Sequence, residues 1–486
     1  MIGSVVLYAD VSPNIIDGSS IWLTSMAEAL TGEFSAVHVL LKMRARTDVL
    51  VGRLRSLPGV AVHEPVGDAT LNVTEAALAI RRLREDVGAR ACVVRGFEAC
   101  HACATDPEVL PHLYSYVTDL PFPVSKLSVA GLNRLQRVAH MTKAMFAQTE
   151  AARSYLEALA PHAAGKTFLL PPMVSDSAFG FGRQRAGLLR TSDRSVQAPS
   201  DARPLKLVYA GKFARDWNTL EMLDLPGAFR SIGVPAELVM IGDKFQKDQN
   251  DPTWHLRMKE ALAAENSNQE SGVTWLGGLP PSEVFEHVAR ADLGLSWRTK
   301  ALDSSLELST KALEYSACGV PPVLNRTADH EALFGESYPF LVDGAWGASA
   351  LVEHVKQAVP HMKDAADVAR TVAADFSISA AKNRIGSAFR GSTAGLSDLG
   401  LSGSRPNHAQ APTRLAIVSH DFKFLGELMG HLDGRTSFTV KTDAWESLHR
   451  HDPDKSLDTA QWADVIFCEW AGPSVNWMAD NKPEDT

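Results

Sequence analysis

The stretch Ser304–Asn325 holds residue types that suit recognition of a phosphorylated ligand. Ser309 or Thr310 can cap a helix that is predicted to start here, because their hydroxyls accept hydrogen bonds from amides of the first turn. The start of a helix offers unpaired N–H groups and a partial positive charge, and both favour a phosphate. Lys311 adds a full charge at that end, and Glu314 lies one turn further on, where a carboxylate can accept hydrogen bonds from a ribose diol. The order of these groups predicts a site for a nucleotide-diphosphate sugar.

The residues that follow define the element that must position this site. Ala312, Leu313 and Ala317 form an apolar face at helical spacing. Gly319 ends the helix, and the pair Pro321-Pro322 prevents its continuation. The unit is therefore predicted to be a loop, a short helix and a buried strand. An ordinary helix–strand unit of an α/β sheet, without a ligand, is the alternative interpretation.

The segment TKALEYSACGVPPV resembles the nucleotide-sugar motif of family-4 retaining glycosyltransferases, which have the GT-B fold. The resemblance implies that Glu314 holds the ribose and that Glu307 is the first glutamate of the motif's pair. Seven positions separate Glu307 from Glu314, whereas the family commonly shows eight.

A second candidate group follows the strand LKLVYAG. The family places a glycine and a cation after this strand and a second cation five residues later. Gly211 and Lys212 match the first two positions. Trp217 stands at the third, so Arg215 is the candidate for the second cation.

Two further segments of this half resemble nucleotide contacts. Gly242 and Lys244 follow the strand AELVMI at its carboxyl end, where open α/β sheets bind ligands. The segment 275–278 (WLGG) resembles the one that holds the base through backbone contacts. A solvated lysine and an apolar core segment are the alternatives.

The first half of the chain offers a glycine loop and two strand ends. Gly18, in the sequence DGSS, resembles the loop that approaches the donor diphosphate and the acceptor, since glycine permits close backbone approach. Asp119 lies where many relatives carry a histidine beside the transferred sugar. The pair Arg95-Gly96 ends a strand and is expected to line the cleft.

Cys100 and Cys103 have the spacing of a redox motif or of half a zinc site. No second cysteine pair lies nearby and the 16 histidines form no recognisable ligand cluster, so we predict a buried or semi-buried structural role and no metal.

The length and amino-acid composition of the chain exclude several classes of protein. A length of 486 residues predicts two or three domains, and 45% hydrophobic with 22% charged residues is typical of a globular protein. The net charge of −9 argues against a general nucleic-acid binder. No apolar run reaches the length of a membrane span, and the start MIGSVVLYADVSP lacks the basic region of a signal peptide. Five scattered cysteines suit a reducing compartment, so a cytoplasmic location is expected.

Apolar strands alternate with helical segments in two halves of the chain, which predicts the α/β class with two doubly wound parallel sheets. The resemblance implies the GT-B architecture of two facing Rossmann-like lobes. The predicted units are a first lobe on the acceptor side (1–182), a linker or long loop (183–203), a nucleotide-sugar lobe with a final helix that crosses back to the first lobe (204–390), a flexible linker (391–413), and a partial Rossmann-like unit (414–486). The last unit resembles the start of a second glycosyltransferase domain, and a small appended subdomain is the alternative.

The resemblance implies transfer of a sugar from a nucleotide-diphosphate sugar to an acceptor hydroxyl with retention of configuration, in polysaccharide or cell-envelope glycan synthesis. The resemblance also implies that helix ends and cations stabilise the leaving diphosphate, so neither a cofactor nor a metal is expected and no protein nucleophile is named. The expected partners are the donor and a glycan, lipid-linked or small-molecule acceptor, without nucleic acid; peripheral membrane association is compatible with this activity. A sugar-nucleotide epimerase and an inactive nucleotide-sugar-binding lobe of a larger assembly are the rival interpretations.

Overall fold

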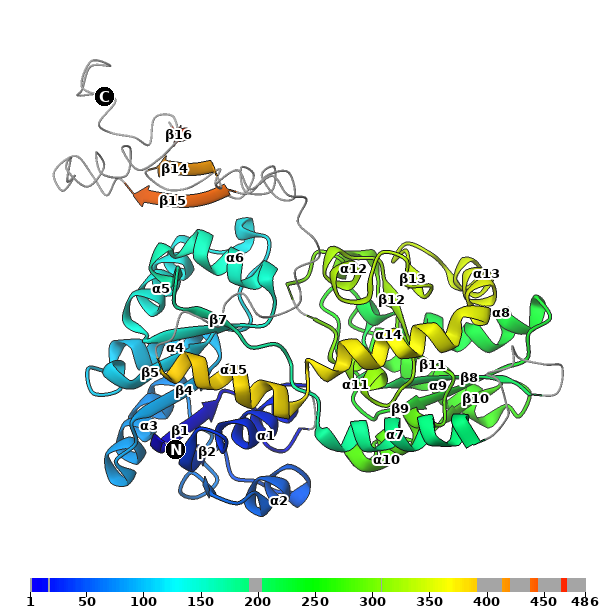
Figure 1. Cartoon of the computed structure of the whole chain (residues 1–486), viewed down its shortest axis with the longest axis horizontal. Helices are drawn as coiled ribbons and strands as arrows, with labels where there is room; N and C mark the ends of the chain where they lie inside the picture. The colour runs from blue at the N-terminus through cyan, green and yellow to red at the C-terminus, as the bar shows by residue number, and fades with distance from the viewer. Residues whose placement is uncertain are drawn as a thin grey trace.

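The computed structural model describes residues 2–15, 18–191, 203–306 and 308–390, together with three strands at 413–419, 438–444 and 465–469. Residues 2–390 build two α/β lobes, each around one parallel sheet (Figure 1). The predicted α/β class with two doubly wound lobes is therefore confirmed.

The first lobe contains a seven-stranded sheet in the order β3-β2-β1-β4-β5-β6-β7, with all neighbours parallel. Its strands are β1 (Ile2–Ala9), β2 (Phe34–Leu40), β3 (Val60–His63), β4 (Ala91–Arg95), β5 (Leu113–Tyr116), β6 (Ala144–Ala147) and β7 (Thr167–Leu169). Its helices are α1 (Gly18–Leu30), α2 (Asp48–Ser56), α3 (Val73–Val87), α4 (Phe97–Thr105), α5 (Val129–Met141) and α6 (Glu150–Leu159).

Helices cover both faces of this sheet, which explains the uninterrupted apolar strands of the sequence. Val6 of β1 belongs to the core on one face, whereas Val5 and Leu7 belong to the core on the other. Cys100 and Cys103 are fully buried in the first of these cores, and burial raises the pKa of both thiols. Their packing agrees with the predicted structural role.

The second lobe contains a six-stranded parallel sheet in the order β10-β9-β8-β11-β12-β13. Its strands are β8 (Leu205–Ala210), β9 (Ala236–Ile241), β10 (Val273–Trp275), β11 (Leu293–Ser296), β12 (Pro322–Asn325) and β13 (Leu341–Val342). The helices of this half of the chain are α7 (Asp176–Thr191), α8 (Leu225–Ser231), α9 (Trp254–Ser267), α10 (Pro281–Ala289), α11 (Thr310–Ala317), α12 (Ala328–Phe334), α13 (Ala348–Ala358), α14 (Met362–Ala374) and α15 (Ile378–Arg390).

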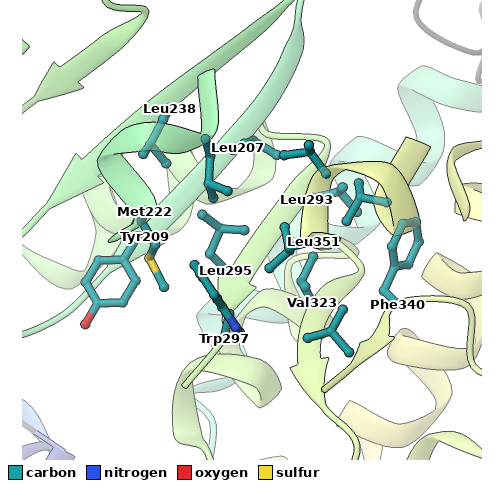
Figure 2. Close-up of a cluster of buried hydrophobic side chains, with 14 of the residues drawn as sticks. Leu207, Tyr209, Met222, Leu238, Leu293, Leu295, Trp297, Val323, Phe340 and Leu351 are labelled. Atoms are coloured by element: carbon teal, nitrogen blue, oxygen red, sulfur yellow. The ribbon is translucent and has the colours of Figure 1, made fainter. Parts of the chain in front are cut away.

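One face of the second sheet carries the large core that Figure 2 shows. Leu207, Leu238 and Leu295 come from three adjacent strands, and Phe340 and Leu351 complete the cluster from the side of β13 and α13. This packing fixes the strands whose carboxyl ends carry the candidate site.

Two crossings of the chain join the lobes. Val174 and Ser377 form a parallel bridge where the chain passes between the lobes in each direction. Beyond this bridge α15 returns to the first lobe (Figure 1), where the centre of the Phe389 ring lies 4.3 Å from that of the Tyr114 ring.

The other crossing leads into α7, which packs on α10 and α11 of the second lobe. The guanidinium of Arg185 donates to the carbonyl of Ala289 at 2.6 Å. The segment 183–203, predicted as a linker or long loop, is thus helical as far as Thr191.

The strands β14 (Thr413–Ser419), β15 (Phe438–Ala444) and β16 (Val465–Glu469) form a third parallel sheet with β14 in the centre. These are the three strands predicted for the last unit, whereas its predicted helices and the linker 391–412 lie outside the described residues. Among the described residues, no helix combines the length and the apolar character needed to cross a membrane.

Candidate functional site

The strand order of each sheet reverses beside its first strand, between β1 and β4 in the first lobe and between β8 and β11 in the second. Open α/β sheets bind ligands at such a switch point, outside the carboxyl ends of the strands. Gly18 begins the helix that follows β1, and Arg95 is the last residue of β4. Gly211 and Arg298 lie in the loops that follow β8 and β11. The strand order of each lobe therefore places these residues at the switch point of its own sheet.

The predicted helix start is present in the second lobe. Ser309 is the N-cap of α11, and its hydroxyl accepts a hydrogen bond from the amide of Ala312 at 3.5 Å. The hydroxyl of Ser296, at the end of β11, lies 2.7 Å from that of Ser309 and ties the cap to the sheet. Thr310 is the first helical residue. Of the two predicted caps, Ser309 is the one that acts.

The lobes meet at this helix start. A Cβ placed on Gly18 would lie 3.9 Å from the Thr310 hydroxyl, so the first residue of α1 faces the first residue of α11. Close by, the Thr149 hydroxyl donates across the lobes to the carbonyl of Leu306 at 3.1 Å. Two helix N-termini with their partial positive charges therefore converge on one point.

Two lysines gather on one indole ring beside these helix ends. The ammonium of Lys311 lies 3.5 Å from the centre of the Trp217 ring, and that of Lys212 lies 4.5 Å from the same centre. Lys311 also lies 5.6 Å from the ring of Tyr209. Its stem runs along Gly211, since a Cβ on that glycine would come within 2.5 Å of Lys311 Cε.

Glycines let the neighbouring loops approach closely. Gly211 and Gly242 have φ angles of +145° and +147°, which other residues rarely adopt. A Cβ on Gly242 would collide with the carbonyl oxygen of Gly211. Gly242 donates to the carbonyl of Gly277 at 2.7 Å, and its own carbonyl accepts from Trp275 Nε1 at 2.8 Å. The predicted WLGG segment is thereby fixed against the loop after β9.

Burial sets the ionisation of the central pair. It lowers the pKa of Lys311 to about 7, with Glu314 opposing the shift and Lys212 and Arg298 adding to it. It raises the pKa of Glu314 to about 7, and Lys311 opposes this shift. Both groups therefore change their charge close to physiological pH, and an arriving phosphate would favour the charged lysine.

Three other predicted residues have the following surroundings, and a fourth cannot be placed. Arg215 is half exposed and pairs with Asp248 at 3.6 Å. Lys244 lies in the loop after β9, where its carbonyl accepts from the amide of Phe213 at 2.8 Å. Asp119 belongs to a cavity of the first lobe, together with Ser19 and Arg95. Glu307 lies outside the described residues.

Arg298 was not predicted. It follows β11, and Asn325 fixes its backbone by accepting from the Arg298 amide and donating to its carbonyl, both at 2.8 Å. Its charge reaches Lys311, whose pKa it lowers. The available signal was its position directly after a strand at the switch point. In the described part of the chain, no group of three His, Cys, Asp or Glu side chains is arranged to hold a metal ion.

No family model and no curated protein matches this sequence. Several solved structures share its fold. HepE from Anabaena, in complex with UDP and glucose, is 14% identical with a TM-score of 0.57, and the match covers 80% of this chain and 99% of HepE. Sucrose-phosphate synthase from Thermosynechococcus elongatus is 13% identical with a TM-score of 0.58, covering 81% and 100%. The trehalose-6-phosphate synthase OtsA is 9% identical with a TM-score of 0.53, covering 79% and 98%. These structures are glycosyltransferases of the GT-B type, so the predicted GT-B architecture is confirmed.

Proposed function

We propose that this chain transfers a sugar from a nucleotide-diphosphate sugar to an acceptor hydroxyl with retention of configuration and without a divalent metal. One observation carries the proposal: Gly18 of α1 faces Thr310 of α11, beside two lysines on one indole ring. Helix N-termini and lysines together suit a diphosphate, because both present positive charge to it.

The reaction requires positive charge beside the leaving diphosphate, and the proposed site supplies it. Cleavage of the bond between sugar and diphosphate leaves negative charge on the phosphate oxygens, and preorganised cations stabilise that charge. Lys311 and Lys212 take this role, with the first-turn amides of α11. The leaving oxygen then accepts the proton of the incoming hydroxyl on the same face of the sugar, so the chain needs no nucleophile of its own.

The remaining donor contacts follow from the same helix. Glu314 lies one turn beyond Lys311 and is proposed to accept hydrogen bonds from the ribose hydroxyls. The backbone of 275–278 is proposed to hold the base. UDP is the first nucleotide to test, because HepE binds it. A role in polysaccharide or cell-envelope glycan synthesis belongs to the proposal as well.

Calorimetry with UDP in excess chelator tests the donor site. We expect saturable binding that chelation leaves unchanged, and complete loss of binding on chelation would refute the metal-free claim. Product analysis with UDP-sugars then separates the activities. A transferase releases UDP only with an acceptor, an epimerase changes the sugar without one, and a binding module does neither.

A further inference from the structure

The first lobe contains a cavity of about 410 Å³ at the carboxyl ends of β1 and β4. Its charged and polar lining includes Asp10, Ser19, Arg95, Asp119, Lys126 and Arg134. Ser19 is the neighbour of Gly18, which faces Thr310, so the cavity begins where the proposed donor site ends. A molecule in this cavity therefore lies next to the transferred sugar.

Arg95 is the unusual member of this lining, because its charge is buried without an opposite charge. The residue is 8% exposed. Its guanidinium donates to the hydroxyl of Ser19 at 3.1 Å and lies 5.1 Å from the centre of the Trp22 ring. Among the described residues, no carboxylate lies within 4.0 Å of Arg95, and its Nε has no hydrogen-bond partner. Burying a cation in this way is costly unless an anion compensates it.

Two of the carboxylates that line the cavity form ion pairs with other cations. Asp10 pairs with Lys42 at 2.8 Å, and Glu98 pairs with Arg134 at 2.8 Å. Lys126 lies at the exposed rim and forms no ion pair within the described ranges. Among the described residues, Arg95 and Lys126 thus have no ion-pair partner, and Asp119 is the carboxylate of the cavity that no cation pairs with.

Helix ends strengthen the positive character of the cavity. Gly96 is the N-cap of α4 but has no side chain to cap that helix, and it lines the cavity with Phe97 of the first turn. Ser128, the N-cap of α5, lines it as well. Anions favour such positions, because the partial charges of the helix N-termini add to that of a nearby guanidinium.

We infer that this cavity binds an anionic group of the acceptor, a phosphate or a carboxylate, through Arg95 and Lys126. The inference rests on the proposed function and names the class of its second substrate. A planar guanidinium matches the oxygens of either group. Asp119, whose carboxylate accepts from the Thr118 hydroxyl at 3.0 Å, also lines the cavity, where it would accept a hydrogen bond from a hydroxyl of the same acceptor.

Nuclear magnetic resonance of arginine Nε–H groups tests the inference directly on the full chain. The Arg95 signal is assigned by its loss in Arg95→Lys. Glucose 6-phosphate, glucuronate and neutral glucose are then titrated. We expect at least one of the two anionic sugars to shift the Arg95 signal and to bind at least tenfold more tightly than glucose. The tighter of the two identifies the group as phosphate or carboxylate.

Two variants distinguish binding at this specific site from nonspecific electrostatic attraction of the anionic sugar. Lys126→Gln, an exposed change that leaves the core intact, should weaken the anionic sugar about threefold, and Arg82→Gln on the exposed face of α3 should have no effect. Equal binding of all three sugars, or equal losses in Lys126→Gln and Arg82→Gln, would overturn the inference. UDP affinity should be the same in the parent and in Lys126→Gln. If the parent fails to bind UDP while the Arg95 signal still responds, the proposed donor site is wrong and the anion site stands.

Discussion

The two lobes hold positive charge at their switch points in different ways. In the second lobe, Lys212 and Lys311 lie on the faces of the Trp217 and Tyr209 rings, among loops that glycines allow to approach closely. In the first lobe, one guanidinium is buried under the start of α1, and two of the surrounding carboxylates, Asp10 and Glu98, are paired with other cations. The second lobe thus gathers two lysines on aromatic rings, whereas the first lobe fixes one planar guanidinium.

This difference suggests that the two lobes have different roles in the reaction. Lysines on an aromatic surface can turn toward a diphosphate and follow the charge that develops on it. A guanidinium held by Ser19 and Trp22 cannot turn, so it suits selection of one ligand shape. The comparison therefore assigns charge stabilisation to the second lobe and acceptor choice to the first, and the following predictions test the first half of that assignment.

The largest effect is expected from Gly211→Ala. The added methyl would displace the end of Lys311 and hold the backbone at a strained φ of +145°. Together these changes should cost about 3 kcal/mol, or roughly a hundredfold in UDP affinity. Calorimetry measures the loss. Gly227→Ala in α8, where a Cβ meets nothing within 4 Å, is the matched control and should bind UDP normally. Normal binding by Gly211→Ala would show that Lys311 does not touch the diphosphate.

Glu314→Ala should weaken UDP about tenfold or more, because a charge-assisted hydrogen bond is worth about 1.5–3 kcal/mol. The parent should bind 2′-deoxy-UDP as weakly as the variant binds UDP, and the variant should not distinguish the two nucleotides. This double comparison isolates the ribose contact from the influence of Glu314 on Lys311. If the variant still discriminates between the two nucleotides, another residue reads the ribose.

UDP affinity should fall as the pH rises above 7. The free site holds Lys311 with a pKa of about 7, and a bound diphosphate raises it, so the complex binds more protons than the free protein above pH 7. The decline is up to about tenfold per pH unit and ends at the pKa of the complex. Calorimetry between pH 7 and 9 measures it. Lys311→Met should flatten the profile, and a profile that stays flat in the parent would contradict the assigned ionisation.

Trp217→Leu should weaken UDP about fivefold, since a cation–π contact contributes about 1 kcal/mol. Trp217→Phe keeps an aromatic face and should recover most of the loss. Trp346→Leu, a partly buried tryptophan outside the donor site, is the control for lost volume. Equal effects of Leu at positions 217 and 346 would mean that Trp217 serves packing alone.

The sequence alone predicts the site of the second lobe better than the cavity of the first lobe. Ser309, Thr310, Lys311 and Glu314 lie within one helical turn and its cap, so local spacing alone predicts their proximity. The first-lobe cavity draws on residues from Asp10 to Arg134, which only the sheet order brings together. Arg215, the predicted second cation, pairs with Asp248, and no local pattern of the sequence reveals this partner.

The smallest effect is expected from a chain that ends at Arg390. Both sheets, the crossing helix α15 and every described residue of the proposed site precede this point. Of the described strands after Arg390, β15 contacts α6 of the first lobe. Helix α6 is distant in the sequence from the loops of the proposed donor site. The shortened chain should therefore bind UDP within about twofold of the full chain and melt within a few degrees of it, since about 1 kcal/mol shifts the melting temperature of a large domain by only a few degrees. Calorimetry and thermal melting measure both. Should the shortened chain aggregate or lose UDP while the full chain does neither, residues after 390 complete the core of the first lobe, and the comparison of two self-sufficient lobes would no longer hold.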